Sequence, residues 1–144
     1  MRFWDASAIV PLLITEGTSR RLQAFVISDP RMAVWWASEV ECVSALVRRE
    51  REGMLDTRAL ETALHQLREF ADAWLEVEPS GFIRESAVRI LRVHTLRAAD
   101  ALQLAAAFAA AERRPASLEM VTLDECLAGA ARKEGFNVVD LAVN

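Results

Sequence analysis

One stretch, LRAADALQLAAAFAAA at positions 96–111, limits the possible folds of this chain more than any other. It consists almost entirely of Ala, Leu and Phe, and Ala is the best helix former, so the stretch is predicted to be helical. A helix that is apolar on nearly every side must be covered by other parts of the protein. Asp100 lies near its start. Because an ionised carboxylate is costly to bury alone, Asp100 is expected to be paired, to bind a metal or to lie at the mouth of a cleft; alternatively, it only complements the helix dipole in the first turn.

The chain has the length and composition of a single globular domain, spanning 1–144. Hydrophobic residues make up 53% and charged residues 26%, and no apolar run reaches the roughly 18 residues that a membrane span requires. Cys42 and Cys126 are isolated and no secretory signal is recognised, so a reducing cytoplasm is the expected location. The formal net charge of −4 argues against a broad basic surface for nucleic acid. It leaves room for a small acidic pocket bordered by arginines.

Strand-like and helix-like segments alternate along the chain. Short apolar segments predict strands at 2–4, 32–36, 75–78, 118–122 and 137–141. Apolar residues at helical spacing predict helices at 8–14, 18–27, 38–52, 56–74, 80–94, 96–111 and 124–135. Pro11 is expected in a first helical turn, and Ser38 and Glu41 have the spacing of a capping box. The alternation predicts an α/β fold, with a central, mostly parallel sheet flanked by helices.

Four carboxylates occupy similar places in this scheme. Asp5 and Asp124 directly follow the first and fourth predicted strands, and Glu41 and Asp100 lie in the first turns of helices. The carboxyl ends of parallel strands meet at one edge of a sheet, where ligands bind, so the four are expected to converge. Taken one at a time, each carboxylate also has a purely structural interpretation, either as a helix cap or as an acidic residue that complements the helix dipole in a first turn. Caps could equally be uncharged, however, and four converging carboxylates repel one another, which predicts a divalent cation such as Mg²⁺ or Mn²⁺ among them.

Four short motifs carry a family resemblance. They occur in this order along the chain: DASA from Asp5, ECVSAL from Glu41, RAADALQLA from Arg97 and TLD from Thr122. In this order they resemble the PIN-domain nucleases, and most of all the VapC-type toxins of bacterial toxin–antitoxin pairs. The likeness extends over nearly the whole chain. The RxxDALxLA stretch is fairly specific, whereas the DxS motif alone is weak.

The resemblance implies a PIN-like three-layer fold and Mg²⁺-dependent endoribonuclease activity, with Mn²⁺ as a substitute. It also implies a homodimer, and a cognate antitoxin that blocks the active-site groove. The family's acidic residues and its small hydroxyl residues correspond here to Asp5, Glu41, Asp100, Asp124, Ser7 and Thr122. Our hypothesis is that Asp5 and Asp100 hold the metal. Glu41 and Asp124 then contact it through water, or join it when RNA arrives.

Other polar residues have two interpretations each. Arg97, one helical turn before Asp100, either contacts RNA phosphate or pairs with a site carboxylate. The arginines between positions 48 and 51 either border an RNA groove or form a solvated helix end. His65 and His94 are interpreted as ordinary helix residues, and Cys42 as a buried structural thiol.

Other phosphate-handling enzymes and a non-enzymatic module are the competing interpretations. A receiver-type phosphoacceptor domain needs a lysine at the end of a late strand, but Lys133, the only lysine, lies within a predicted helix. A haloacid-dehalogenase-like phosphatase needs a second Asp where Ser7 stands. An inactive PIN-fold interaction module, a housekeeping RNA-processing enzyme and a structure-specific nuclease stay open. The short chain, without an added RNA-binding domain, favours the toxin.

Overall fold

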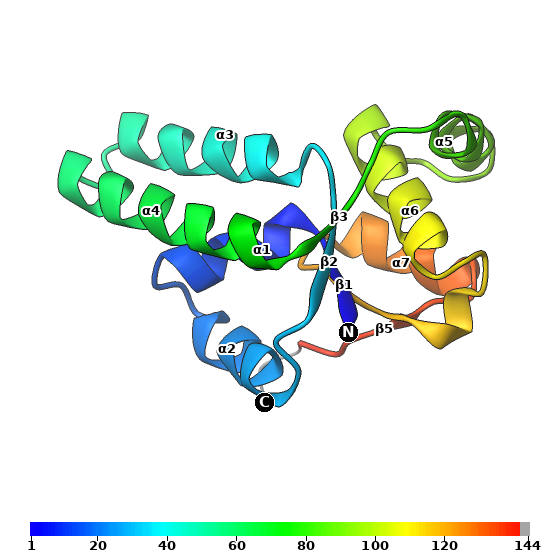
Figure 1. Ribbon diagram of the computed structural model, residues 1–144. Helices are drawn as coiled ribbons and strands as arrows, with labels where there is room; N and C mark the ends of the chain where they lie inside the picture. Colours follow the sequence, from blue (N-terminus) through cyan, green and yellow to red (C-terminus); the bar gives the residue numbers. More distant parts are fainter. Residues whose placement is uncertain (142–144) are drawn as a thin grey trace.

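A computed structural model describes residues 1–141, and these form three layers, with a central β-sheet between two layers of helices (Figure 1). Within these residues the sheet has five strands, in the order β3-β2-β1-β4-β5. All neighbouring strands are parallel, so the predicted α/β class is confirmed and the sheet is parallel throughout. The strands are β1 (Arg2–Trp4), β2 (Met32–Trp35), β3 (Leu75–Val77), β4 (Glu119–Val121) and β5 (Asn137–Val138).

The sheet divides the hydrophobic core into two halves, because successive side chains of a strand point to opposite faces. In β1, Phe3 belongs to one half and Trp4 to the other, and both are fully buried. Phe3 is paired in register with Ala33 of β2 and Met120 of β4, which lie in the same half. The same burial on both faces explains why β2, which is buried throughout, is a continuous apolar run in the sequence.

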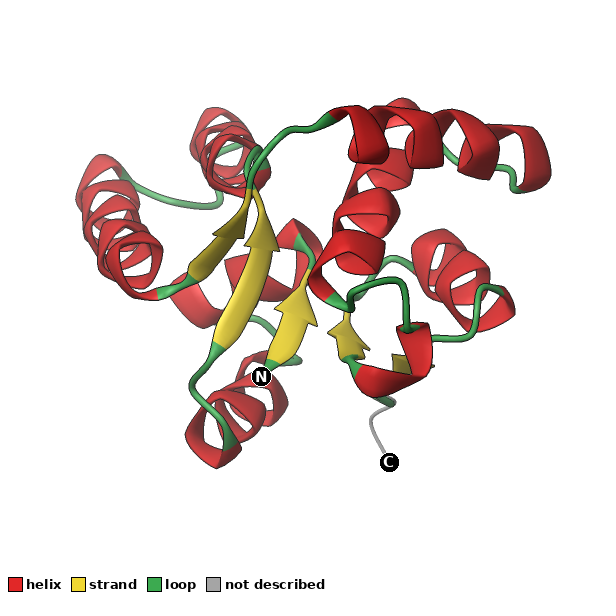
Figure 2. Cartoon of the chain, turned by 45° about the vertical axis from the view of Figure 1, so that its right-hand side comes forward, coloured by secondary structure: helices red, strands yellow, loops and turns green. Residues whose placement is uncertain are grey.

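The helices are divided between the two faces of the sheet. One face is covered by α1 (Ala6–Leu13), α2 (Ser19–Ser28), α3 (Ser38–Arg51) and α4 (Thr57–Ala73), and the other by α5 (Gly81–Val93), α6 (Ala98–Ala110) and α7 (Glu125–Lys133). A short 3-10 helix, η1 (Pro115–Ser117), precedes β4. The strand arrowheads that are clearly visible in Figure 2 point the same way, and α1, α3, α5 and α7 each follow the carboxyl end of a strand.

Four helices begin with side-chain caps. Asp5 caps α1 and Asp124 caps α7, as the sequence predicted, and Asp56 and Ser80 cap α4 and α5. In each case a side-chain oxygen accepts a backbone N–H of the first turn, which would otherwise lack a partner. The caps fix Asp5 and Asp124 at the carboxyl ends of β1 and β4.

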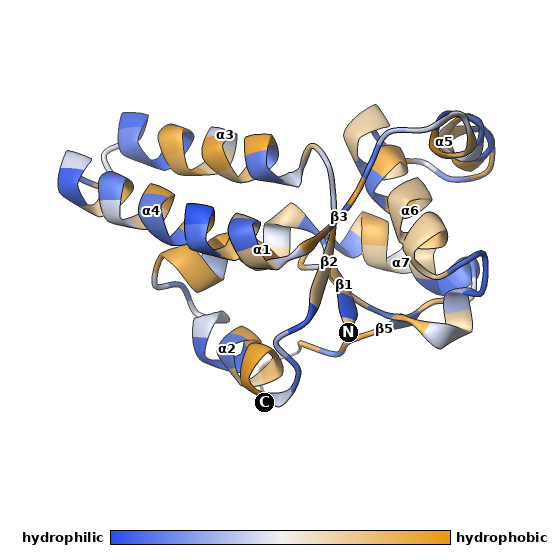
Figure 3. Cartoon of the chain, in the orientation of Figure 1, coloured by the Kyte–Doolittle hydropathy of each residue, from blue (hydrophilic) through white to orange (hydrophobic). Residues whose placement is uncertain are grey.

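Helix α6 lies deep in its half of the core, as its composition predicted. It packs against α5, α7, β2 and β3, and Leu104–Ala107 are fully buried. Figure 3 shows hydrophobic colours through most of α6, whereas α4 has a hydrophilic outer side. Asp100 lies in the first turn, next to the exposed residues 97–99. Among residues 1–141, no helix combines the length and the apolar character that crossing a membrane requires.

Two local predictions are wrong. Pro11 does not lie in a first turn, because α1 already begins at Ala6, directly after its cap, and Pro11 lies in its interior. Ser38 does not cap α3: the N-cap is Ala37, without a side-chain hydrogen bond. The Ser38 hydroxyl instead accepts a hydrogen bond of 3.0 Å from Gln103 of α6. The predicted capping box is therefore absent, and Glu41 has other contacts.

Candidate active site

The chain reverses its direction across the sheet between β1 and β4. After β1 it runs outward to β2 and β3, and then returns to β4 on the other side of β1. Ligands of open parallel sheets bind at such a point, outside the carboxyl ends of the strands. Asp5 and Asp124 flank it, and the Asp5 N–H donates a 3.0 Å hydrogen bond to the Val121 carbonyl. The two acids are therefore tied to the position that most often forms a binding site.

All four predicted carboxylates line one cavity of about 690 Å³ at this edge of the sheet. Glu41 comes from the first turn of α3 and Asp100 from the first turn of α6, so they approach from opposite layers. The cavity is also lined by the polar side chains of Ser7, Glu16, Ser44, Arg48, Arg49 and Arg97. The fold thus brings together acids that are far apart in the sequence.

Asp5 is held by hydroxyl groups. Both the Ser7 hydroxyl and the Thr122 hydroxyl donate to Asp5 Oδ2, the latter at 2.9 Å. The hydroxyls are oriented in turn by backbone groups: Leu123 N–H donates to Ser7 Oγ at 2.9 Å, and Asp124 N–H donates to Thr122 Oγ1 at 3.1 Å. Ser7 and the buried Thr122, both singled out in the sequence, therefore lie where they position Asp5.

These contacts leave one oxygen of Asp5 without a protein donor. Within the described residues, the hydrogen bonds to this carboxylate all go to Oδ2, and none goes to Oδ1. Asp5 is only 5% exposed. Its burial raises the pKa of Asp5, the hydrogen bonds from Ser7 and Thr122 oppose that shift, and the charge of Asp100 adds to it. A buried carboxylate with one oxygen free of hydrogen bonds is suited to act as a ligand of a cation.

Like-charge repulsion links the four acids. Burial raises the pKa of Glu41, and the charges of Asp5 and Asp100 add to this effect, whereas a hydrogen bond from Gln103 opposes it. Burial also raises the pKa of Asp100, with a further contribution from Asp124. Carboxylates that shift one another in this way share one electrostatic environment.

These raised pKa values predict how the stability of the metal-free protein depends on pH. A carboxyl group whose pKa is higher in the folded state contributes stability that is complete below its unfolded pKa and is lost as the pH rises through its folded pKa. At neutral pH the ionised Asp5 is therefore destabilising. In excess chelator, Asp5→Asn should raise the midpoint of thermal unfolding at pH 7 and have a smaller effect at pH 4. Calorimetry at both pH values tests this, and an equal shift at both would contradict it.

The donor set suits a hydrated cation. Among residues 1–141, no three His, Cys, Asp or Glu side chains lie close enough together to form a ready-made metal cage. Mg²⁺ does not require one, since it keeps several waters and usually binds through one or two carboxylates together with substrate phosphate oxygens. Carboxylate oxygens are also ligands for Mn²⁺. The donor set of the cavity therefore suits either ion, with one or two carboxylates as ligands and water in the other positions.

Three arginines border the carboxylates. Arg97 Nε lies 3.6 Å from Asp100 Oδ2, so Arg97 does pair with a site carboxylate, but its side chain is 85% exposed and such a pair contributes little. Arg49 is engaged by Glu16, with 2.8 Å between Nη2 and Oε1. Arg48 is exposed and makes no ion pair with any described residue. Arg48 is therefore available to an anionic ligand.

The contact between Gln103 and Glu41 was not predicted from the sequence. Gln103 Nε2 donates a 3.1 Å hydrogen bond to Glu41 Oε2, from α6 to α3. The sequence contains one signal for it, because Gln103 is the only polar residue between positions 101 and 111. Its partner could not be read from the sequence, since the two residues belong to different layers.

His94 and Cys42 lie outside the lining of the cavity. His94 is not an ordinary helix residue, because it follows the end of α5 and its Nε2 lies 2.8 Å from Glu134 Oε1. Burial acts to raise the pKa of Glu134, but hydrogen bonds from Arg89 and His94 outweigh it and lower that pKa. Cys42 is fully buried and burial raises its thiol pKa, so it is a structural thiol as predicted.

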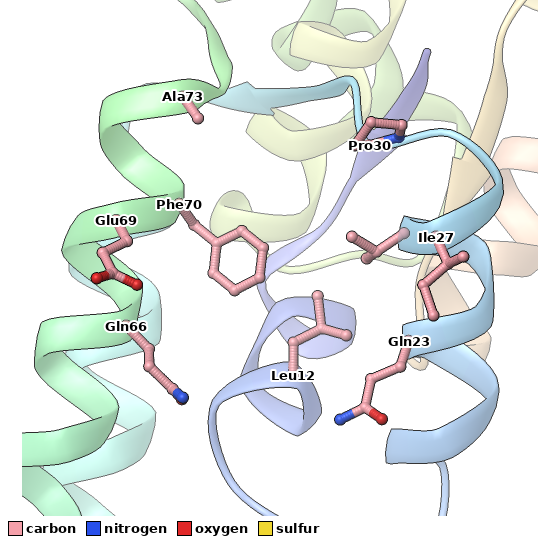
Figure 4. Close-up of a pocket in the computed structure, with 9 residues that line it drawn as sticks. Leu12, Gln23, Ile27, Pro30, Gln66, Glu69, Phe70 and Ala73 are labelled. Atoms are coloured by element: carbon pink, nitrogen blue, oxygen red, sulfur yellow. The ribbon is translucent and has the colours of Figure 1, made fainter.

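A second cavity differs in character from the acidic one. It has a volume of about 560 Å³ and lies between α2 and α4, with Leu12 of α1 beside Phe70 (Figure 4). Most of its lining is apolar, and among the described residues Glu69 is its one ionisable side chain. Because chemistry on a charged substrate requires converging polar groups, the acidic cavity is the candidate active site.

Solved structures share the fold of this chain. A chain of a toxin–antitoxin complex from Klebsiella pneumoniae matches 99% of it with 98% of its own length, at a TM-score of 0.66 and 18% identity. The match to FitAcB from Neisseria gonorrhoeae covers 98% of each of the two chains, with a TM-score of 0.65 and 17% sequence identity. The match to PAE2754 from Pyrobaculum aerophilum covers 95% of this chain and 87% of PAE2754, with a TM-score of 0.67 and 20% sequence identity. The fold is PIN-like.

The sequence itself has no comparable match. No protein-family model matches it, and neither does any curated protein. At 17–20% identity, the structural likeness establishes the PIN-like fold and no more. The acidic cavity is therefore the feature of this PIN-like chain that indicates its chemistry.

Proposed function

We propose that this chain is a Mg²⁺-dependent endoribonuclease and the toxin of a type II toxin–antitoxin pair. Its PIN-like fold also occurs in a toxin–antitoxin complex, and its motifs resemble VapC-type toxins. The observation that carries the proposal is the convergence of Asp5, Glu41, Asp100 and Asp124 on one cavity at the point where the sheet reverses.

Electrostatics supports a cation in this cavity. Asp5 has no ion pair among the described residues, and Arg97 is too exposed to neutralise Asp100. A phosphodiester would bring a further negative charge into the same space, so it could approach only with a cation that offsets the repulsion. Burial raises the pKa values of Asp5, Glu41 and Asp100, so their ionised forms are destabilised unless a cation offsets the charge.

We assign the ion to Asp5 and Asp100, with Asp5 Oδ1 as the free ligand oxygen. When bound, Mg²⁺ would activate a water molecule and offset the charge that develops on the phosphoryl group. Ser7 and Thr122 hold the Asp5 carboxylate through Oδ2. Glu41 and Asp124 would accept hydrogen bonds from water in the cavity and thereby orient it. The helix caps of Asp5 and Asp124, and the hydroxyls bound to Asp5, place these two side chains in advance, which lowers the cost of assembling the site.

Arg48 is expected to bind a phosphate of the RNA. Arg48→Ala should raise KM for a single-stranded RNA with little change in kcat. The logarithm of the RNA association constant falls linearly with the logarithm of the salt concentration, and the loss of one phosphate contact should make this slope less steep by about 0.7. Fluorescence anisotropy with Mg²⁺ and a non-cleavable RNA analogue, over a range of monovalent salt concentrations, measures the slope. Arg92→Ala, on an exposed position of α5, is the matched control, and an identical slope change in both variants would contradict a specific role for Arg48.

The protein partners that we propose are a cognate antitoxin and a second copy of the chain. A toxin–antitoxin complex with this fold supports the first. We expect the antitoxin to cover the acidic cavity and to inhibit cleavage. Light scattering of the purified chain tests the homodimer, and co-purification with the product of a small neighbouring reading frame tests the antitoxin.

The deciding experiment is cleavage of total RNA by the purified chain, with Mg²⁺, with Mn²⁺ and with excess chelator. Internal cleavage in the presence of either metal, and its loss in chelator, is the expected result, and mapping of the cut ends would give the sequence preference. Intact RNA together with no Mn²⁺ binding would contradict the proposal and leave the inactive interaction module. A preference for structured DNA would favour the structure-specific nuclease.

A further inference from the structure

Gln103 is a buried polar residue in the apolar part of α6. It is 1% exposed and lies one helical turn after Asp100. Its Nε2 donates to two acceptors, Glu41 Oε2 at 3.1 Å and Ser38 Oγ at 3.0 Å. Its Oε1 is also buried, and no described residue donates to it. The amide group thus uses only its nitrogen.

The carboxylate of Glu41 decides how this amide is oriented. If the amide were rotated by half a turn, Gln103 Oε1 would face Glu41 Oε2, and two acceptors without a proton between them repel each other. The observed orientation leaves Oε1 unpaired, which is unfavourable for a buried oxygen. Packing alone would therefore be served better by Leu or Met at this position. The benefit of a glutamine lies in its donor.

The hydrogen bond also connects the two helical layers. Glu41 belongs to α3, on one face of the sheet, and Gln103 to α6, on the other (Figure 1). The same helix α6 carries Asp100, whose charge repels Glu41. Without a donor, repulsion from Asp5 and Asp100 would favour rotation of the Glu41 side chain out of the cavity. Gln103 opposes that rotation.

We propose that Gln103 is a positioning residue, whose side-chain amide holds Glu41 toward the acidic cavity and thereby raises its affinity for a divalent ion. This inference rests on the proposed function, since it requires that the cavity bind such an ion. Groups that orient the ligands of a metal without binding it typically change metal affinity by 10- to 100-fold when they are removed; Glu41 would be such a group through water, and Gln103 acts through Glu41.

The test measures Mn²⁺ binding by titration calorimetry in wild type, Gln103→Met, Glu41→Gln and the double variant. Met has nearly the same volume as Gln and no donor. We expect Gln103→Met to weaken Mn²⁺ binding about 10- to 100-fold, with a midpoint of thermal unfolding close to that of wild type. In the Glu41→Gln background the same change should cause no further loss, because Gln103 acts through Glu41.

Ser38→Ala is the matched control, because it removes the other acceptor of the same Nε2. We expect it to leave Mn²⁺ affinity nearly unchanged. A loss as large as that of Gln103→Met would show that packing around Gln103, and not its donor, sets the affinity, and would overturn the inference. So would losses that add up in the double variant.

Two failures can be told apart. If the wild-type chain binds no Mn²⁺, the proposed function fails, whereas binding that Gln103→Met leaves unchanged refutes only the role of Gln103. Should Gln103→Met not fold, the side-chain amide signal of Gln103 in NMR spectra gives the answer without a substitution at this position. The inference requires that this signal shift when Mg²⁺ is added and also when Glu41 is replaced by Gln, and an unmoved signal in either case would refute it.

Discussion

Asp5→Asn is expected to reduce Mg²⁺-dependent RNA cleavage by at least about 10³-fold, because a catalytic metal contributes several kcal/mol to transition-state stabilisation. The variant should keep its fold. Asn is as good a helix cap as Asp, and its side-chain oxygen can still accept the hydroxyls of Ser7 and Thr122. The neutral amide, however, is a much weaker ligand for a hard cation. Single-turnover cleavage with saturating enzyme measures the loss separately from RNA binding.

Asp56→Asn is the matched control for this prediction. Asp56 also caps a helix, with a 2.7 Å hydrogen bond from Ala59 N–H, but it does not line the acidic cavity. The same chemical change should therefore leave cleavage intact. Undiminished metal-dependent cleavage by a pure Asp5→Asn, Asp100→Asn double variant would show that these carboxylates do not hold the ion, and with it the assignment of the site would fail.

The sequence was sufficient to predict the edge at which the acids meet, because that prediction needs only local information. An Asp that follows a short strand within three residues, as Asp5 follows β1 and Asp124 follows β4, is placed by the strand and by its own capping hydrogen bond. If the strands are parallel, all such positions lie at one edge. The alternation of strands and helices gave that parallel arrangement, and the five-stranded order in residues 1–141 agrees with it.

Contacts between distant segments could not be predicted in this way. The Ser38 hydroxyl has the right spacing for a capping box with Glu41, yet both side chains are bound by Gln103 from another layer. Local capping propensity is worth about 1 kcal/mol, and a buried amide that bonds to both groups outweighs it. The contact of His94 with Glu134 is of the same kind, since it joins α5 to the end of α7. Tertiary partners of this type require the assembled layers.

Two neighbouring residues of α6 should affect different properties of the protein. Leu104 should determine the stability of the fold, and Gln103 the affinity for the ion. Leu104 is fully buried, between Gln103 and the alanines that follow. Leu104→Ala should lower the free energy of unfolding by about 2–5 kcal/mol, because it creates a cavity in a core that is packed on both sides of the helix. Urea denaturation with an unchanged m-value measures this. Val88→Ala, at a 55% exposed position of α5, should change stability by less than about 0.5 kcal/mol.

The affinity for Mn²⁺ should follow the reverse pattern: Gln103→Met should lower it, whereas Leu104→Ala should leave it unchanged. Below its unfolding transition, Leu104→Ala should bind Mn²⁺ as wild type does, because the carboxylates and their hydrogen bonds do not involve the Leu104 side chain. Gln103→Met should lose affinity at nearly unchanged stability. If Leu104→Ala also lost Mn²⁺ binding while still folded, general packing of α6 would set the geometry of the acids. The hydrogen bond from Gln103 to Glu41 would then not be what holds them.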